Sequence, residues 1–297
     1  LVEESLKGWK EIEFEVIRDK NDHCFTVVSM ENVDPLGVHT GESIVVAPTC
    51  SLTDKELDLL KELSIKTIRH LGIVGECNIQ YAFNSDTCDY RVIEVNARLS
   101  RSSALASKAT GFPIALVSAM LASGLTLDEI PCGKYGTLDK YVPDGDYVGI
   151  KFARWAFEKF KGVQDKLGTQ MRAVGEVMSI GKTYKEAFQK AIRSLEIGRY
   201  GLGFAKDFHE KSKEELLKML SVPTSERQFI MYEALRKHAT VDELFELTKI
   251  KHYFIEQMKE LVEEEEALLA DKGSVPSEEA LRQAKLDGFS DKYLSQI

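Results

Sequence analysis

The chain has 297 residues, of which 43% are hydrophobic and 29% are charged, so it is long enough for two packed domains and is not a disordered polymer. Its formal net charge of −9 argues against a general nucleic-acid-binding protein, and no apolar run approaches the roughly 20 residues that cross a bilayer. Five cysteines without a CxxC pair favour reduced thiols in the cytoplasm, with the mitochondrial matrix as the alternative compartment. The first residues include neither Met nor a basic signal segment, so we expect a piece of a longer polypeptide.

Residues up to about 100 are predicted to form two hairpins and one helix. Residues 9–18 alternate charged and apolar side chains, which is typical of a strand. By this pattern Glu11, Glu13 and Glu15 belong to a solvated face. The other predicted elements are a strand at 24–30, a short strand at 44–47, a helix capped by Thr53 and Glu56 that continues to Leu71, and a second hairpin of 78–83 with 90–95.

The rest of the chain is predicted to change from mixed structure to helices. Helices are expected at 104–108, 114–122 and 183–195, with strands at 147–152 and 176–180. Glycines 198, 201 and 203 indicate a boundary, which divides an α+β domain at 1–202 from an all-helical domain at 203–297. In the second domain we expect helices at 214–220, 226–237, 241–247, 253–269 and 277–286.

An oxygen-rich cluster is predicted where the second hairpin ends. Glu94 and Asn96 are two residues apart on a strand, so their side chains point to one face. If the strands of this hairpin pair, the Gln80 amide joins them, and this donor set suits a hard cation such as Mg²⁺. Arg98 and Arg101 follow at once and suit a phosphate or a carboxylate-like anion. The pattern favours nucleotide-dependent phosphoryl transfer; the alternative is an ordinary polar face of a hairpin.

The remaining reactive side chains give weaker signals. His39 lies in a polar loop at 39–43, where it either approaches a phosphate or is merely exposed. No cysteine has a visible His partner, which disfavours a thiol nucleophile. The sequence contains neither GxxxxGK[ST] nor GxGxxG, so a P-loop or Rossmann nucleotide site is disfavoured. Structural or exposed positions are expected for His70, His209, His238 and His252.

The run from Ile93 to Gly111, IEVNARLSRSSALASKATG, closely resembles the first synthetase half of carbamoyl phosphate synthetase large subunits, which are ATP-grasp enzymes. The stretches ESLKGWKE at 4–11, RDKN at 18–21, the residues from Glu31 to Ser43 and VGEVMSIG at 174–181 resemble the same half. Other ATP-grasp ligases share Glu-x-Asn-x-Arg but not the continuation SRSSALASK. The resemblance implies the C-terminal part of an ATP-grasp domain, followed by the family's helical oligomerisation domain.

The resemblance also implies an activity and its residues. The implied reaction is phosphorylation of bicarbonate by ATP to carboxyphosphate, which ammonia converts to carbamate. ATP, Mg²⁺ or Mn²⁺ and also K⁺ are the implied cofactors, and the implied partners are a glutaminase subunit or domain and further copies of the chain. In the implied site, Gln80, Glu94 and Asn96 hold the divalent metals; His39, Arg98 and Arg101 contact the phosphates and bicarbonate; Glu4, Leu6, Glu11, Gly37, Val38 and His39 bind the nucleotide; and Glu11, Asn32, Ser43 and Glu94 hold K⁺.

Two departures limit what the resemblance implies. The family's glycine-rich loop lies upstream of Leu1, so we expect residues 1–297 alone to be inactive, and the segment 131–154 departs from the family pattern. Two other functions stay open at this point: a non-catalytic assembly module, and another ATP-grasp carboxylate ligase. No nucleic acid or membrane partner is expected.

Overall fold

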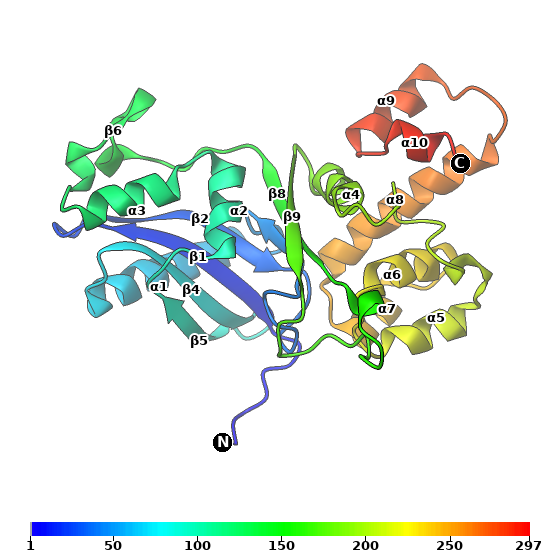
Figure 1. Ribbon diagram of the computed structural model, residues 1–297, viewed down its shortest axis with the longest axis horizontal. Helices are drawn as coiled ribbons and strands as arrows, with labels where there is room; N and C mark the ends of the chain where they lie inside the picture. The colour runs from blue at the N-terminus through cyan, green and yellow to red at the C-terminus, as the bar shows by residue number, and fades with distance from the viewer. Residues whose placement is uncertain (1) are drawn as a thin grey trace. The chain divides into compact units, whose positions relative to one another are not determined.

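The computed structural model describes residues 2–297 (Figure 1). Two compact units divide the chain, and each is built from two stretches of it. Unit 1 comprises the residues up to Asn32 together with Val46–Gly149, and unit 2 comprises Val33–Val45 together with Ile150–Ile297. The chain passes from one unit to the other after Asn32, within strand β3 (Val45–Ala47) and within strand β8 (Val148–Arg154).

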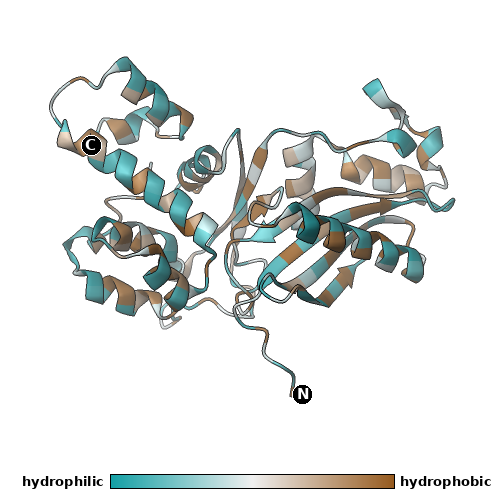
Figure 2. Ribbon diagram, turned by 180° about the vertical axis from the view of Figure 1, so that it is seen from behind, coloured by the Kyte–Doolittle hydropathy of each residue, from teal (hydrophilic) through white to brown (hydrophobic). Residues whose placement is uncertain are grey.

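Unit 1 contains an antiparallel sheet with the strand order β5-β4-β1-β2. Its strands are β1 (Lys10–Arg18), β2 (Cys24–Asn32), β4 (Gly75–Asn84) and β5 (Asp89–Asn96). Both predicted hairpins are therefore confirmed. In Figure 2 hydrophobic residues run along these strands, as expected for a sheet that is covered by helices.

One face of this sheet packs against α1 (Asp54–Leu71). Buried apolar residues of β1 and β4, including Ile12 and Phe14, form one cluster with Leu60 and Ile68 of α1. The predicted capping box is present, because the Thr53 side chain accepts a hydrogen bond from the Glu56 backbone while the Glu56 carboxylate accepts one from Thr53. A cap of this kind fixes where the helix begins, and the apolar stripe then fixes which way it faces.

Two further helices of unit 1, α2 (Arg101–Thr110) and α3 (Ile114–Ala122), contact the strands as well. The helix predicted at 104–108 thus begins earlier, at Arg101, because Ser100 and Ser103 cap its first turn. Small elements follow α3: η1 (Leu127–Glu129), and then, inside the divergent segment, β6 (Pro131–Cys132), η2 (Gly133–Tyr135), β7 (Gly136–Thr137) and η3 (Leu138–Lys140).

Unit 2 is mostly helical. It contains β9 (Gly175–Gly181), on which α4 (Tyr184–Ser194) packs, and then helices alone. These are α5 (Lys213–Leu220), α6 (Arg227–Arg236), α7 (Val241–Thr248), α8 (His252–Ala270), α9 (Glu278–Leu286) and the unpredicted α10 (Asp291–Leu294). Two short 3₁₀ turns also belong to unit 2: η4 (Phe157–Lys159), before β9, and η5 (Phe208–Glu210), before α5. Since the described residues after Gly181 contain no strand, the prediction of mixed structure followed by helices is confirmed.

Gly201 and Gly203 have a packing role inside unit 2. A Cβ atom on Gly201 would lie 2.6 Å from ring carbons of Tyr293, and Gly203 donates its backbone N–H to the Tyr293 hydroxyl over 3.0 Å. The absence of a side chain is what lets the backbone approach this buried ring. The domain boundary at residues 202 and 203 stays a prediction.

Candidate metal and anion site

The hairpin of β4 and β5 places the three predicted metal ligands next to one another. Gln80 pairs directly with Glu94, and Asn78 pairs with Asn96 two positions along the ladder. The Asn96 side-chain nitrogen donates a hydrogen bond to Glu94 Oε1 over 2.8 Å, which confirms that these two side chains share a face. Gln80 and Asn96 are half-buried and Glu94 is exposed. One carboxylate and two amides therefore meet at an accessible edge of the sheet.

A β-bulge produces this alignment. The register between β4 and β5 shifts after Gln80, so that Gln80 faces Glu94 while the next residue, Tyr81, faces Val92. Ile93 is left as the extra residue of β5. Without this bulge, a regular ladder would set Gln80 opposite the apolar Ile93, and the Glu94 carboxylate would no longer lie beside the Gln80 amide. Bulges commonly re-aim side chains beside active sites, and this one brings a carboxylate to the Gln80 amide.

The two predicted anion-binding arginines follow this edge. Arg98 donates to Asn96 Oδ1 and to the Leu99 carbonyl, each over 3.4 Å, and its guanidinium remains exposed. Arg101 is exposed in the first turn of α2. Positive charge thus lies immediately beside the oxygen cluster, the arrangement that a metal-bound phosphate requires.

Two acidic residues that the alternating pattern placed on the surface are buried. Glu13 and Glu15 are fully buried, so their predicted exposure is wrong, and Glu11 is also buried, as its implied role in the nucleotide site suggested. The cause is that helices cover the sheet on both faces, whereas alternation in sequence shows only that the two faces differ. The Asn78 side-chain nitrogen donates to Glu13 Oε2 and to Glu15 Oε1, each over 3.0 Å. Sequence reasoning missed Asn78, although it lies two residues before Gln80 on the same strand face.

A second buried carboxyl, Glu76, lies close to Glu15. The Ser103 hydroxyl is 3.2 Å from Glu15 Oε2 and 3.2 Å from Glu76 Oε1. Burial and the neighbouring Glu76 raise the pKa of Glu15 well above its usual range, and burial also raises the pKa of Glu76. These acidic residues near the predicted metal ligands are therefore buried, and the pKa values of Glu15 and Glu76 are shifted towards the protonated form.

His39 lies in unit 2, in a tight loop. Its ring Nδ1 accepts a hydrogen bond from the Gly41 backbone over 2.9 Å, and its own backbone N–H donates to the Gly168 carbonyl over 2.8 Å. Because Nδ1 is an acceptor, Nε2 carries the proton of the neutral ring and is the donor that remains. His39 and Gly37 are exposed and Val38 is buried.

Glu42, which the sequence did not single out, organises the same loop. Its carboxylate accepts hydrogen bonds from the Trp155 ring nitrogen over 2.8 Å and from the backbone of Arg172 and Ala173 over 2.5 and 2.6 Å. A buried carboxylate with three donors holds the chain around His39 in place. Ser43, a predicted potassium ligand, donates to Asp34 Oδ2 over 3.0 Å.

The other predicted ligands occupy varied environments in unit 1. Glu4 is exposed and Leu6 is half-buried, with its carbonyl accepting the Trp9 N–H over 3.1 Å. Asn32 is buried, and among the residues that the structure describes neither polar atom of its side chain has a hydrogen-bond partner. An unbonded buried amide is costly, so Asn32 fits a position that a bound cation or water would complete.

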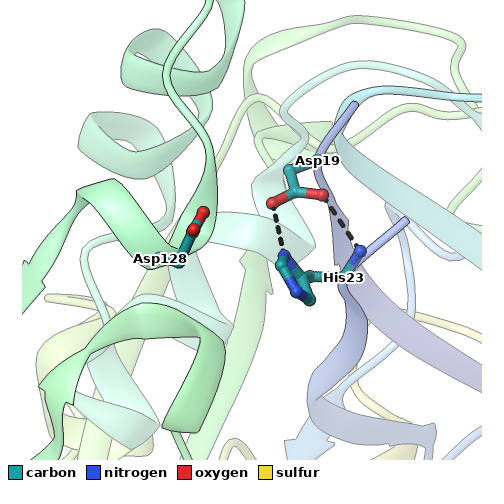
Figure 3. Close-up of side chains that lie close together, drawn as sticks. All are labelled: Asp19, His23 and Asp128. Atoms are coloured by element: carbon teal, nitrogen blue, oxygen red, sulfur yellow. Dashed lines mark hydrogen bonds and ion pairs between the residues drawn. The ribbon is translucent and has the colours of Figure 1, made fainter. Parts of the chain in front are cut away.

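Asp19, His23 and Asp128 also lie close together, in unit 1 (Figure 3). The buried Asp19 carboxylate already accepts backbone N–H groups of Asn21, His23 and Leu127. His23 Nδ1 adds a fourth contact at 3.0 Å, drawn as a dashed line in Figure 3. These hydrogen bonds explain why Asp19 is buried, because its carboxylate joins the β1–β2 turn to η1. We therefore assign no metal to it.

Comparison with known proteins gives the family. Residues 1–130 match the model for the carbamoyl-phosphate synthase L chain ATP binding domain, and residues 176–297 match the model for the carbamoyl-phosphate synthetase large chain oligomerisation domain. The chain belongs to the carbamoyl phosphate synthase large-chain family. The expected family and the α+β fold class, an ATP-grasp portion followed by helices, are thereby confirmed.

Family members align with the whole chain. It is 48% identical to the carbamoyl phosphate synthase large chain, N-terminal section, of Methanopyrus kandleri, covering 100% of this chain and 55% of that protein. It is 49% identical to the large chain of Clostridium botulinum strain Loch Maree, covering 28% of it, and 51% identical to the multifunctional protein CAD of Squalus acanthias, covering 13% of it, with 100% and 99% of this chain aligned. The chain thus spans about half or less of the length of these relatives.

A solved structure shares the fold at low sequence identity. The complete multifunctional pyruvate carboxylase of Rhizobium etli aligns with 64% of this chain and 21% of its own, with a TM-score of 0.51 and 14% identity. Among residues 2–297, no single helix is both long and apolar enough to cross a membrane; α2 and α3 reach that composition only together, and they meet at a bend of 115°.

Proposed function

We propose that this chain is part of an ATP-grasp ligase, a carbamoyl phosphate synthase large chain, and contributes to the ATP-dependent phosphorylation of bicarbonate. The product, carboxyphosphate, would react with ammonia to give carbamate on the way to carbamoyl phosphate for pyrimidine or arginine biosynthesis. The observation that carries this proposal is the alignment of Gln80, Glu94 and Asn96 beside Arg98, in a chain that is about half identical to these synthases.

The donor set fits a divalent metal. A carboxylate with two amide oxygens is the oxygen-rich environment that Mg²⁺ and Mn²⁺ prefer. We propose that Gln80, Glu94 and Asn96 hold the metal, with Glu94 able to bridge two ions because a carboxylate offers two oxygens. The bound metal would neutralise phosphate charge as the γ-phosphoryl group is transferred.

A monovalent cation is proposed from the buried polar residues. The side-chain amide of Asn32 lacks a hydrogen-bond partner in the described part of the chain, and Glu11 is buried with it in unit 1. Both observations support a cation at Glu11 and Asn32; Ser43 and Glu94 complete the proposed K⁺ ligands only through the resemblance to the family.

The charged and loop residues have proposed roles in binding the anions and the nucleotide. The exposed guanidinium groups of Arg98 and Arg101 would hold bicarbonate and the γ-phosphate, and His39 would donate from Nε2 to a phosphate oxygen. Glu4 and Leu6 are assigned to the adenine. Glu11 is assigned to the ribose, and Gly37 and Val38 to the nucleotide beside His39.

Partners of the longer protein are proposed on the same basis. A glutaminase subunit or domain would supply the ammonia, and the match of residues 176–297 to an oligomerisation domain supports self-association. We infer that residues 1–297 alone do not turn over ATP, since the glycine-rich loop implied by the family is not among them.

Two measurements test the proposed function. The first is thermal unfolding of the chain with ATP in the presence and absence of Mg²⁺: a nucleotide site predicts Mg²⁺-dependent stabilisation, and a non-catalytic module predicts none. The second is ATP hydrolysis by the longer protein with bicarbonate varied. Hydrolysis that does not respond to bicarbonate would point to another ATP-grasp carboxylate ligase.

A further inference from the structure

Two buried carboxyls of unit 1 share a single hydroxyl donor. Ser103 Oγ is within hydrogen-bond distance of Glu15 Oε2 and of Glu76 Oε1, at 3.2 Å in each case. A serine hydroxyl has one proton and can donate to only one of these carboxyls at a time. Ser103 Oγ also accepts the Ser100 backbone N–H over 2.9 Å, so it is already an acceptor in the capping box of α2.

The surroundings of this pair supply little positive charge. Glu15 and Glu76 are 0% and 4% exposed, and neither forms an ion pair with a Lys or Arg of the described residues. The titratable groups that face the pair are Glu13 of β1, reached through Asn78, and the exposed Arg98. The Cys77 thiol of β4 is close in sequence but packs on the opposite face of the strand, against α1. Two adjacent carboxylates in such a place repel strongly, whereas one proton between them removes the repulsion and adds the missing donor.

Glu15, together with Glu13, fixes an amide of β4. Glu15 Oε1 and Glu13 Oε2 both accept from the Asn78 side-chain nitrogen, which uses both of its N–H bonds. Asn78 Oδ1 must then point the other way, and there it accepts the Gln80 Nε2 over 3.1 Å. Gln80 is left with its amide oxygen for the row that contains Glu94.

We propose that Glu15 and Glu76 share one proton, and that Glu15, through Asn78, holds the Gln80 amide with its oxygen available to a cation beside Glu94. Glu15 and Asn78 are positioning residues, Glu76 acts only as the partner in the shared proton, and the inference deepens the metal site proposed above. Amide oxygens bind hard cations and amide nitrogens do not, so the direction of this hydrogen-bond chain decides whether Gln80 is a metal ligand.

The test uses carboxyl ¹³C and side-chain amide NMR on the metal-free chain, for the wild type, Glu15→Gln, Glu76→Gln and Ser103→Ala. Glu62→Gln, an exposed glutamate of α1, is the matched control. At pH 7 the wild type should hold one proton between Glu15 and Glu76. In Glu76→Gln, Glu15 should be ionised, with hydrogen exchange of the Gln80 amide unchanged. Glu15→Gln should raise this exchange on the order of tenfold, because a neutral amide oxygen replaces the carboxyl that accepts the Asn78 N–H and orients Asn78.

Two results would overturn the inference: zero or two protons on the pair at pH 7, or equal Gln80 exchange in Glu15→Gln and Glu62→Gln. If Glu15→Gln does not fold, the other two variants test the shared proton. Glu15 should be ionised at pH 7 in Glu76→Gln, and Ser103→Ala should still hold one proton between Glu15 and Glu76. A parallel Mn²⁺ titration separates the two proposals. Should Glu94→Gln bind Mn²⁺ as well as the wild type, the metal site fails, while the NMR result on the metal-free chain still decides the shared proton.

Discussion

Asp34 and Arg227 form a buried, two-point ion pair inside unit 2, although 193 residues separate them in the sequence. Arg227 Nε donates to Asp34 Oδ1 over 2.6 Å, and a second guanidinium nitrogen donates to Asp34 Oδ2. The pair ties the first residue of α6 to the segment that also carries Ser43 and His39. The fold of the helical residues therefore holds a loop to which we assign nucleotide and cation contacts.

Breaking this pair should destabilise unit 2. Asp34→Ala leaves a buried guanidinium without its partner, which costs about 3–5 kcal/mol in the free energy of unfolding. Urea unfolding followed by Trp155 fluorescence measures it, since the Arg227 guanidinium lies 5.6 Å from the Trp155 ring centre. The control is Glu246→Gln, which breaks the exposed pair with Lys249 and should change little. A Trp155 transition at the wild-type urea concentration in Asp34→Ala would contradict the prediction.

Loss of the proposed metal-bridging charge should stop catalysis in the longer protein. Glu94→Gln keeps the shape of the side chain and removes its charge, so bicarbonate-dependent ATP hydrolysis should fall on the order of 100-fold or more. Glu62→Gln should retain the wild-type rate. Since Glu94 is exposed at the edge of the sheet, thermal unfolding of the variant should match that of the wild type. Near-normal hydrolysis by a folded Glu94→Gln protein would sink the metal assignment.

The stability of unit 2 should depend on pH through Glu264 of α8. Burial, and then the neighbouring Asp287, raise the pKa of Glu264 from 4.5 to about 7. Because the pKa in the folded state is the higher one, the unfolded chain loses its proton first, and stability falls as pH rises from about 4.5 to about 7. Glu264→Gln should remove this loss and stabilise the protein at pH 8 by about 1–2 kcal/mol.

Chemical unfolding at several pH values measures the effect of Glu264. The exposed neighbour Glu263→Gln is the control, and it should follow the wild-type pH profile. If the free energy of unfolding changes with pH in the same way in Glu264→Gln and in the wild type, the Glu264 carboxyl does not titrate in this range.

We expect the chain to self-associate through a small exposed apolar surface. Many apolar residues of helices α5 to α8 are buried within the chain, including Leu216, Phe229 and Leu244, so these side chains offer no surface to a second copy. Exposed leucines remain on α9, where Leu281 and Leu286 are 42% and 57% exposed. We expect light scattering at micromolar concentration to give a mass above one chain for the wild type, and the mass of one chain for the double variant Leu281→Glu/Leu286→Glu.

The control for self-association is Leu71→Glu, an exposed leucine of unit 1. A wild-type chain that stays monomeric throughout the micromolar range would refute the assembly prediction and would leave the catalytic proposal untouched.

Local signals in the sequence were enough to predict most of the helices and strands and one side of the site. Thr53 and Glu56 are three residues apart and cap their helix wherever it packs. Glu94 and Asn96 are two residues apart on a strand, so their shared face follows from strand geometry alone. The hairpin that carries Gln80 joins two strands that follow each other in the chain, so its existence, though not its exact register, is predictable from alternation and a polar turn.

Tertiary structure decided what is buried and in which direction the polar groups point. Alternation in β1 distinguished two faces but could not show that helices cover both, so only the fold reveals that Glu13 and Glu15 are interior. The extra residue Ile93 that aligns Gln80 with Glu94, and the pairing of Asp34 with Arg227, also depend on register and on long-range packing. Periodicity reports how a residue relates to its neighbours in sequence; burial and hydrogen bonding depend on which distant segments cover it.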